Sequence, residues 1–309
     1  MINVSDINKP APVGRLRAAS LGTDIDHGQM RIAAANLIAC LGPVGTYSED
    51  AAILYFGSSS KRLLLPSLDA IFEACESGLA SHSVVAVENS TEGAVPRTLD
   101  LLYKTELQIC GELSLLLRHD LLTQSGQLHG VTRVRAHAQA LAQCHGWLST
   151  NAPHLIREAV SSNAEGARLA AQDPTSAAIG GLRSAEEYGL LAAFHAVQDD
   201  PNNRTRFFVL SRKDNASEAL GVGCKTSIIV SVPNEVGALF RVVEPFARHG
   251  VSMSRFESRP VKSGAWDYNF YIDIVGSRLE EKVANALAEL QQQGAKVKLL
   301  GSYFDTDQH

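Results

Sequence analysis

Polar side chains able to bind a ligand gather in four short clusters of the sequence, and each cluster follows a short apolar run. The clusters are Gly42–Ser48, Glu88–Gly93, His137–Gln139 and Ser161–Asn163. In an open α/β sheet, ligands bind beyond the carboxyl ends of the strands. Helices begin at that edge too, and their N–H groups attract anions. The spacing therefore predicts one pocket that holds a small anionic ligand through hydroxyls, amides and N–H groups.

Taken one at a time, the same residues have ordinary structural explanations. The Gly-Pro-Val-Gly sequence at 42–45 is typical of a turn, and Thr46, Ser48 and Ser162 can cap helices. A lone His137 fits a hydrogen-bonded structural role. Glu88 is harder to explain, because a carboxylate directly after four apolar residues needs a partner or a task. The prediction of a site rests on separate loops converging on one face.

Several other chemistries lack the residues they need. The ten histidines include no i, i+4 pair beside a carboxylate, which argues against a metal site. The glycines at 42 and 45 complete neither a dinucleotide fingerprint nor a phosphate loop, and no Gly-x-Ser-x-Gly elbow is present. Lys plus Arg is 28 and Asp plus Glu is 33, a formal charge of −5. General nucleic-acid binding is therefore not expected.

The compartment is predicted from hydropathy and cysteine use. No apolar run reaches the roughly 18 residues of a membrane span, and Met1–Ala35 has no secretory hydrophobic core. The five cysteines form no Cys-x-x-Cys pair and are predicted to be reduced, buried thiols. We expect a cytoplasmic protein with no membrane partner.

The elements that must position these groups begin at Leu37, where β-like and helical runs alternate as in an α/β domain. Thr46 with Glu49, and Ser162 with Glu165, have the spacing of a helix-capping box, and Ser67 can cap Leu68–Glu76. The predicted strands are Leu37–Leu41, Leu63–Leu65, Ser83–Val87, Leu107–Leu117, Val131–Arg135, Ile156–Val160, Ala177–Ile179 and Arg206–Leu210.

A second unit follows the polar, glycine-containing stretch 213–224, which is interpreted as a linker. Its order βαββαβ is the ferredoxin-like arrangement. The predicted elements are Thr226–Val232, Val236–His249, Val251–Glu257, Trp266–Val275, Arg278–Gln293 and Val297–Tyr303, with a kink or break expected at Pro245. The chain is thus divided into a tail (1–36), a larger α/β unit (37–212), a linker (213–224), a second domain (225–303) and a short tail (304–309).

Six segments resemble, in order, the motifs of the prephenate dehydratase family. The last two resemble the phenylalanine-binding motifs of that family's ACT domain. The segments are Gly42-Pro43-x-Gly45-Thr46-Tyr47-Ser48-Glu49, Val87–Val95 with Thr98–Leu102, His137-x-Gln139-Ala140-Leu141-x-Gln143-Cys144, Asn203-x-Thr205-Arg206-Phe207, Gly237-Ala238-Leu239 and Glu257-Ser258-Arg259-Pro260. The resemblance spans residues 37 to 303. It implies an α/β fold, with a two-lobed, periplasmic-binding-protein-like catalytic domain followed by a ferredoxin-like ACT domain.

Some positions depart from the family's usual motifs. The third motif has Ala136 and Ala138 where Ser and Pro are usual, and Asn163 stands where Thr is frequent. The ACT loop has Val236 in place of Pro, which affects the expected loop geometry and effector affinity. No group assigned to catalysis is lost.

The resemblance implies conversion of prephenate to phenylpyruvate with loss of carbon dioxide and water, without cofactor or metal. Thr205, by itself an ordinary strand former, is implied as the catalytic residue. Because a neutral threonine is a weak acid, the proton donor stays open between Glu88 and His137. Arg206, by itself a plain surface charge, is expected to bind a substrate carboxylate. The expected substrate-binding residues are Thr46, Tyr47, Ser48, Asn89, Ser90, Gln139, Ser162, Asn163, Arg206 and Phe207.

The ACT motifs imply inhibition by L-phenylalanine bound between two copies of the chain. A homodimer or homotetramer is therefore expected. The expected effector-binding residues are Gly237, Ala238, Leu239, Glu257, Ser258, Arg259 and Pro260.

Other functions remain open from the sequence. A related enzyme could dehydrate arogenate, giving phenylalanine directly, or could decarboxylate prephenate without aromatising it. A non-enzymatic solute-binding module would share the two-lobed pattern but would leave Thr205-Arg206-Phe207 without a role. Some family members carry an N-terminal chorismate mutase domain. Residues 1–36 are too short for its helices, so no mutase activity is expected.

Overall fold

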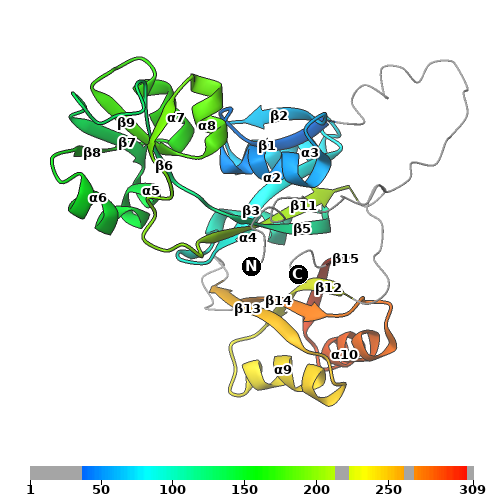
Figure 1. The fold of residues 1–309 in the computed structure, drawn as a ribbon. Coiled ribbons are helices and arrows are strands. Elements are labelled where there is room, and N and C mark those ends of the chain that lie inside the picture. The colour runs from blue at the N-terminus through cyan, green and yellow to red at the C-terminus, as the bar shows by residue number, and fades with distance from the viewer. Residues whose placement is uncertain (1–36, 213–222, 261–267, 305–309) are drawn as a thin grey trace, which may run out of the picture.

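The computed structural model describes residues 37–212, 223–260 and 268–304. The expected tail 1–36, most of the expected linker and residues 305–309 lie outside the described residues. Figure 1 shows two lobes side by side and a third, smaller unit against one of them.

The first lobe is built on a sheet with strand order β2-β1-β3-β11-β5, in which β4 also pairs with β3. β1 is parallel to β2 and β3, whereas β11 is antiparallel to both β3 and β5. The strands are β1 (Leu37–Leu41), β2 (Lys61–Leu65), β3 (His82–Asn89), β4 (Gly93–Ala94), β5 (Gln108–Leu116) and β11 (Arg204–Ser211). The helices are α2 (Tyr47–Phe56), α3 (Leu68–Glu76) and α4 (Pro96–Lys104).

Strand β11 is covered on both faces, which explains its nearly continuous apolar sequence. Phe207 and Val209 pack with α2, whereas Phe208 and Leu210 pack with α3 and α4. Successive side chains of a strand point to opposite faces. Thr205 therefore shares the face of Phe207, and Arg206 shares the face of Phe208.

The second lobe is inserted between β5 and β11, so two segments of chain cross between the lobes. Its sheet has the order β10-β6-β9-β7-β8. The strands are β6 (Asp120–Thr123), β7 (Arg133–His137), β8 (Ile156–Val160), β9 (Ser176–Gly180) and β10 (Leu191–Phe194). The helices are α5 (Ala138–Gln143), α6 (His145–Asn151), α7 (Asn163–Ala170) and α8 (Leu182–Tyr188).

The third unit has the expected βαββαβ order and an antiparallel sheet, β13-β14-β12-β15. One face packs on its two helices, through residues such as Ile228 and Val230 of β12. The other face packs on the first lobe. Ile229, which lies between Ile228 and Val230 in the sequence and faces the opposite side, belongs to the core cluster that contains Leu99 and Phe208. The elements are β12 (Cys224–Val232), α9 (Ala238–Arg248), β13 (Met253–Pro260), β14 (Tyr268–Val275), α10 (Glu281–Gln292) and β15 (Lys296–Phe304).

The structure confirms the α/β fold class and moves several element boundaries. β3 runs on to Asn89, β7 begins at Arg133 and ends at His137, and Cys224 belongs to β12 rather than to a linker. The expected break at Pro245 is wrong, because α9 continues through that residue. Proline removes one backbone hydrogen bond there, because it has no N–H, and Pro245 is buried beside the fully buried Phe246. Packing of this buried helix face outweighs the missing bond.

Candidate active site

A cavity of about 240 Å³ lies between the two lobes of the larger unit, with walls from both. That volume suits a small molecule rather than a polymer. Most of the residues predicted to bind or convert a substrate line it. These are Thr46, Tyr47, Ser48, His137, Gln139, Ser162, Asn163, Thr205 and Phe207.

Helix N-termini from both lobes surround the cavity. Thr46 caps α2 by accepting from the amide of Glu49 (3.3 Å), and Ser162 caps α7 by accepting from the amide of Glu165 (3.0 Å). The start of α5 at His137 and the start of α8 at Gly181 line the cavity as well. First-turn amides have no partner within their own helix. Each such N-terminus stabilises a nearby anion by about 0.3–1 kcal/mol.

The start of α2 is held against the second lobe by a close backbone approach at Gly45. Its φ of +87° is in the region that favours glycine, and an added Cβ would lie 3.2 Å from the Cα of Ser184. The Gly45 amide donates to Glu49 Oε2 (2.8 Å), and Ser184 Oγ donates to the Gly45 carbonyl (2.6 Å). These bonds place the helix terminus at the cavity wall.

The floor of the cavity is apolar apart from Thr205. Phe207 is 1% exposed and lies two residues along β11 from Thr205, which is 8% exposed. Leu41, Ala86 and Leu117 also contribute to the lining. This part of the lining is therefore an apolar surface with one hydroxyl, that of Thr205.

Asn89 lies behind Thr205 and sets the direction of its hydroxyl. Asn89 Oδ1 accepts from the backbone amides of Thr91 (3.0 Å) and Glu92 (3.2 Å), which can only donate. The Asn89 amino group must therefore face Thr205, and it donates to Thr205 Oγ1 (2.9 Å). Because Thr205 accepts this bond, its own O–H is available to donate into the cavity.

The same hydrogen-bond chain continues across the cleft to the second lobe. Thr91 Oγ1 donates to Asn89 Oδ1 (2.6 Å) and accepts from Gln143 Nε2 (3.0 Å). Gln143 Oε1 lies 3.0 Å from His119 Nε2, and His119 Nδ1 lies 2.8 Å from the Tyr47 hydroxyl. Both lobes are thus joined through the residue that orients Thr205.

His119 was not predicted from the sequence, although it lines the cavity and is only 1% exposed. Burial lowers the pKa of His119 below its ordinary value of 6.5, opposed by its bond to Gln143. Burial also raises the pKa of Tyr47 well above its usual value. Both groups are therefore neutral near pH 7. The signal for His119 was the polar triplet Arg118-His119-Asp120 inside a long apolar stretch.

His137 lies at the mouth of the cavity, at the end of β7. Its amide donates to Asn163 Oδ1 (2.9 Å), and its ring Nδ1 accepts from the Gln139 amide (3.4 Å). With Nδ1 accepting, the neutral ring carries its proton on Nε2 and can donate to a ligand.

Glu88, Asn89, Ser90 and Arg206 were predicted to reach the substrate, but they are not among the residues that line the cavity. Glu88 pairs across the ladder with Arg206, on the opposite face of the sheet from Thr205. Ser90 Oγ instead accepts from the Arg204 amide (2.9 Å) at the start of β11. The expectation that Arg206 binds a substrate carboxylate and that Glu88 donates a proton does not match these positions. Residue types alone did not show which face each side chain occupies.

The predicted effector-binding residues lie in two segments of the third unit. Gly237, with φ +77°, caps the start of α9, followed by Ala238 and Leu239. The segment from Glu257 to Pro260 lies on β13, which is an edge strand of its sheet. Arg259 in that segment donates to Asp100 of α4 (2.8 Å), so this side chain reaches the first lobe.

Among residues 37–212, 223–260 and 268–304, no group of three His, Cys, Asp or Glu side chains is placed to hold a metal ion. Within the same ranges, no helix is long and apolar enough to cross a membrane.

The depressed pKa of His119 predicts a specific pH dependence of stability. As pH falls through 6.5, the unfolded chain takes up a proton at this residue and the folded chain does not. His119→Gln should therefore lose less stability than the unaltered protein between about pH 8 and about pH 5.5 in thermal unfolding. His129→Gln, at an exposed position of the same lobe, is the control and should match the unaltered slope. Equal slopes for all three proteins would contradict the prediction.

Comparison with known proteins identifies the family. The profile of the family described as prephenate dehydratase matches residues 38–215, and that described as ACT domain matches residues 226–292. A bifunctional chorismate mutase/prephenate dehydratase of Neisseria gonorrhoeae is 43% identical, over 97% of this chain and 83% of that protein. Arogenate dehydratase/prephenate dehydratase 2 of Arabidopsis thaliana is 35% identical, over 86% of this chain and 72% of that protein.

Solved structures have the same two-part architecture. Prephenate dehydratase of Arthrobacter aurescens in complex with L-Phe has a TM-score of 0.80 and 32% identity, covering 88% of this chain and 91% of that one. A protein described as the quorum-quenching acylase GqqA has a TM-score of 0.80 and 28% identity, covering 88% and 98%. The two-lobed unit with its inter-lobe cavity is the catalytic domain, and the βαββαβ unit is the ACT domain. The chain belongs to the prephenate dehydratase family.

Proposed function

We propose that the protein converts prephenate to phenylpyruvate, carbon dioxide and water, using one proton. The observation that carries this proposal is the cavity between the lobes, which combines helix N-termini with a hydroxyl donor, Thr205, on an apolar floor. A dianionic ring compound with a leaving hydroxyl matches those three features.

The carboxylates of prephenate are assigned to the helix N-termini. The amides at the starts of α2 and α7, with the hydroxyl of Ser48 beside them, supply donors from both lobes. Thr46 and Ser162 act mainly as caps, because their oxygens already accept from Glu49 and Glu165. Their role is to keep the helix ends open toward the anion.

The reaction breaks two bonds and needs a proton. The ring C–O bond breaks and the hydroxyl leaves as water, while loss of carbon dioxide returns an electron pair that completes the aromatic ring. Thr205 donates a hydrogen bond to the leaving hydroxyl. His137 at the cavity mouth is the assigned proton source, and it donates from Nε2 as an imidazolium, which leaves the neutral ring behind. In the imidazolium form Nδ1 also carries a proton and gives up the 3.4 Å bond from the Gln139 amide. No cofactor is required, because aromatisation drives the elimination.

Arogenate is the second candidate substrate, since a relative bears both dehydratase names. Arogenate carries an ammonium group where prephenate has a keto group. The residues that line the described cavity include no Asp or Glu to pair with that ammonium. This favours prephenate.

The ACT domain is assigned as a site for feedback inhibition by L-phenylalanine. The Arthrobacter aurescens relative is described as a complex with L-Phe. Val236, Leu239 and Phe240 are 99%, 51% and 62% exposed around Gly237, and β13 is an edge strand. Pairing of two copies would cover this apolar surface, which supports a homodimer, or a homotetramer built from it, with the effector at the shared interface.

A cytoplasmic location is part of the same proposal. All five cysteines are unpaired, and Cys40, Cys75, Cys144 and Cys224 are buried. Reduced thiols suit a reducing compartment.

Thr205→Ala should lower kcat for phenylpyruvate formation by about 10²- to 10³-fold, the usual effect of removing one preorganised hydrogen-bond donor from an active site. KM for prephenate should change much less, and Thr205→Ser should retain more activity because it keeps the hydroxyl. Ultraviolet absorbance of phenylpyruvate measures the rate, with arogenate assayed in parallel. Near-normal turnover by a folded Thr205→Ala protein would show that the assigned role is wrong.

L-Phenylalanine should inhibit the unaltered protein, and Gly237→Ala should raise the half-inhibitory concentration. The substitution strains a backbone with φ +77° at the predicted effector site. Gly250→Ala, with φ +64° and open space around it, is a matched control elsewhere in the ACT domain. If both variants shifted inhibition equally, the effect would be general strain and the assignment of Gly237 would fail.

A further inference from the structure

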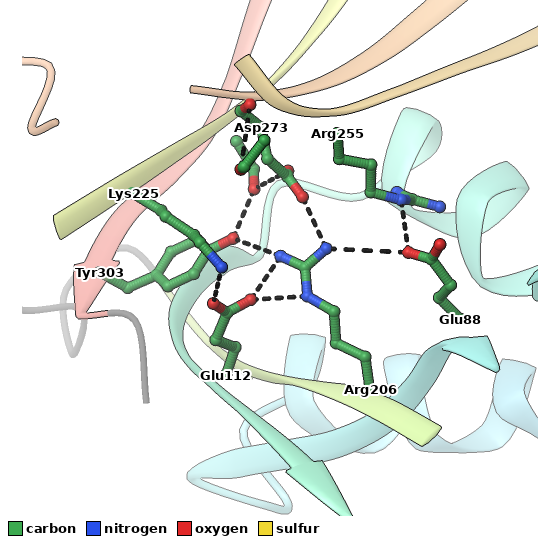
Figure 2. A network of polar contacts seen from close by, with 9 residues as sticks. Glu88, Glu112, Arg206, Lys225, Arg255, Asp273 and Tyr303 are labelled. Atoms are coloured by element: carbon green, nitrogen blue, oxygen red, sulfur yellow. Dashed lines mark hydrogen bonds and ion pairs between the residues drawn. The ribbon is translucent and has the colours of Figure 1, made fainter. Parts of the chain in front are cut away.

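Six charged side chains lie between the catalytic sheet and the ACT sheet, on the face of β11 opposite Thr205 (Figure 2). They come from β3, β5 and β11 of the catalytic domain and from β12, β13 and β14 of the ACT domain. This interface cluster consists of Glu88, Glu112, Arg206, Lys225, Arg255 and Asp273. Three of these residues are acidic and three are basic, so their formal charges cancel.

Arg206 is the centre of the interface cluster and contacts both domains. Its Nε donates to Glu112 Oε2 of the catalytic domain (2.7 Å). Its Nη1 donates to Asp273 Oδ2 of the ACT domain (2.6 Å), and its Nη2 lies 3.3 Å from the Tyr303 hydroxyl. All three guanidinium nitrogens are engaged. Burial opposes this charge, yet Asp273, Tyr303 and Glu112 together hold the pKa of Arg206 above its ordinary value.

The carboxylates that hold Arg206 are themselves held by the ACT domain. Lys225 Nζ donates to Glu112 Oε1 (2.8 Å), and Ser227 Oγ donates to Asp273 Oδ1. The side chains of Glu112 and Asp273 are 1% and 4% exposed. Charges this deeply buried tolerate little loss of partners. Each buried charge of the interface cluster therefore keeps its opposite charge only while the two sheets keep this relative position.

Arg206, through which β11 contacts the ACT domain, lies next to an irregularity in the pairing of β11 with β3. Arg206 is opposite Glu88, but Phe207 is already opposite Ala86, so one residue of β3 is left over. Regular pairing between the two strands is interrupted there, so side-chain contacts contribute more to holding β11 in place. Thr205 is the neighbouring residue on the cavity side.

We propose that Arg206 is a positioning residue, which fixes β11 through Glu112 and Asp273 and so makes the placement of the Thr205 hydroxyl depend on the ACT domain. This inference rests on the proposed dehydratase function. If the ACT sheet shifts, Asp273 moves with it and its ion pair displaces the Arg206 side chain. The backbone of β11 beside Thr205 is then displaced as well. The same link also gives inhibition by L-phenylalanine a route from the ACT domain to the catalytic hydroxyl.

Asp273→Asn tests the link from the ACT side, because Asp273 contacts Arg206 on the face opposite Thr205 and does not line the cavity. The variant keeps the shape and one acceptor oxygen but removes the charge opposite Arg206. We expect kcat to fall about 10-fold or more with KM for prephenate within about twofold, because only a transition-state contact is disturbed. The half-inhibitory concentration of L-phenylalanine should rise about 10-fold.

Lys298→Met is the matched control, because it removes a different contact between the two domains. Lys298 Nζ donates to the carbonyls of Tyr103 (2.9 Å) and Thr105 at the C-terminal end of α4, and it makes no bond to the Arg206 side chain. It should leave kcat and the response to L-phenylalanine near those of the unaltered protein. An equal loss in Lys298→Met and Asp273→Asn would mean general loosening of the interface and would overturn the inference.

Variants of Arg206 separate positioning from substrate binding. Arg206→Gln should lower kcat, Arg206→Lys should recover part of it, and adding Asp273→Asn to Arg206→Gln should cause little further loss. A raised KM with unchanged kcat in Arg206→Gln would mark a substrate ligand and overturn the inference. So would an Asp273→Asn protein that behaves like the unaltered one. An unaltered protein that forms no phenylpyruvate would instead defeat the proposed function itself.

Discussion

Successive residues of strand β11 must face opposite sides of the catalytic sheet, and both sides carry function. Thr205 and Phe207 face the cavity, whereas Arg206 and Phe208 face the ACT domain. Arg206 also lies over the Phe208 ring, with its Cζ 4.8 Å from the ring centroid. On its cavity side, β11 is held by Asn89, which donates a hydrogen bond to the Thr205 hydroxyl. On its ACT side, the strand is held by the buried ion pairs of Arg206. The Thr205 hydroxyl cannot move independently of either set of contacts.

The electrostatic attraction of the cavity for an anion comes from groups around the cavity and not from the net charge of the chain. The chain carries a formal charge of −5, yet the proposed substrate is a dianion. Attraction comes from helix ends of both lobes that meet at one cavity, and from hydroxyl and amide donors beside them. Buried apolar residues such as Leu117 and Phe207 line part of the cavity, and dipoles act more strongly beside such low-dielectric walls than on an open surface. On the opposite face of the sheet, the six charged side chains of the interface cluster are paired with each other and are not among the residues that line the cavity.

Features set by local chemistry were predictable from the sequence. The predicted helix caps at Thr46, Ser67 and Ser162 were confirmed. Each hydroxyl accepts from an amide three residues later in its own helix, so the bond does not depend on how distant parts of the chain fold. Strand boundaries were less accurate, since pairing partners extend β3 past Val87 and shift β7 toward His137. The faces of Glu88 and Arg206 depend on register across β3 and β11, which residue types do not report. In the sequence only the polar triplet Arg118-His119-Asp120 marks His119, and only the folded chain brings Tyr47 and Gln143 to it.

Amide hydrogen exchange of residues 204–211, with and without saturating L-phenylalanine, is the most direct measurement of how the ACT domain acts on Thr205. If the ion pairs at Arg206 couple the two domains, the effector should change exchange in this strand as well as in the ACT domain. Changes confined to the ACT domain, with inhibition present and β11 exchanging identically in both conditions, would contradict the proposed coupling.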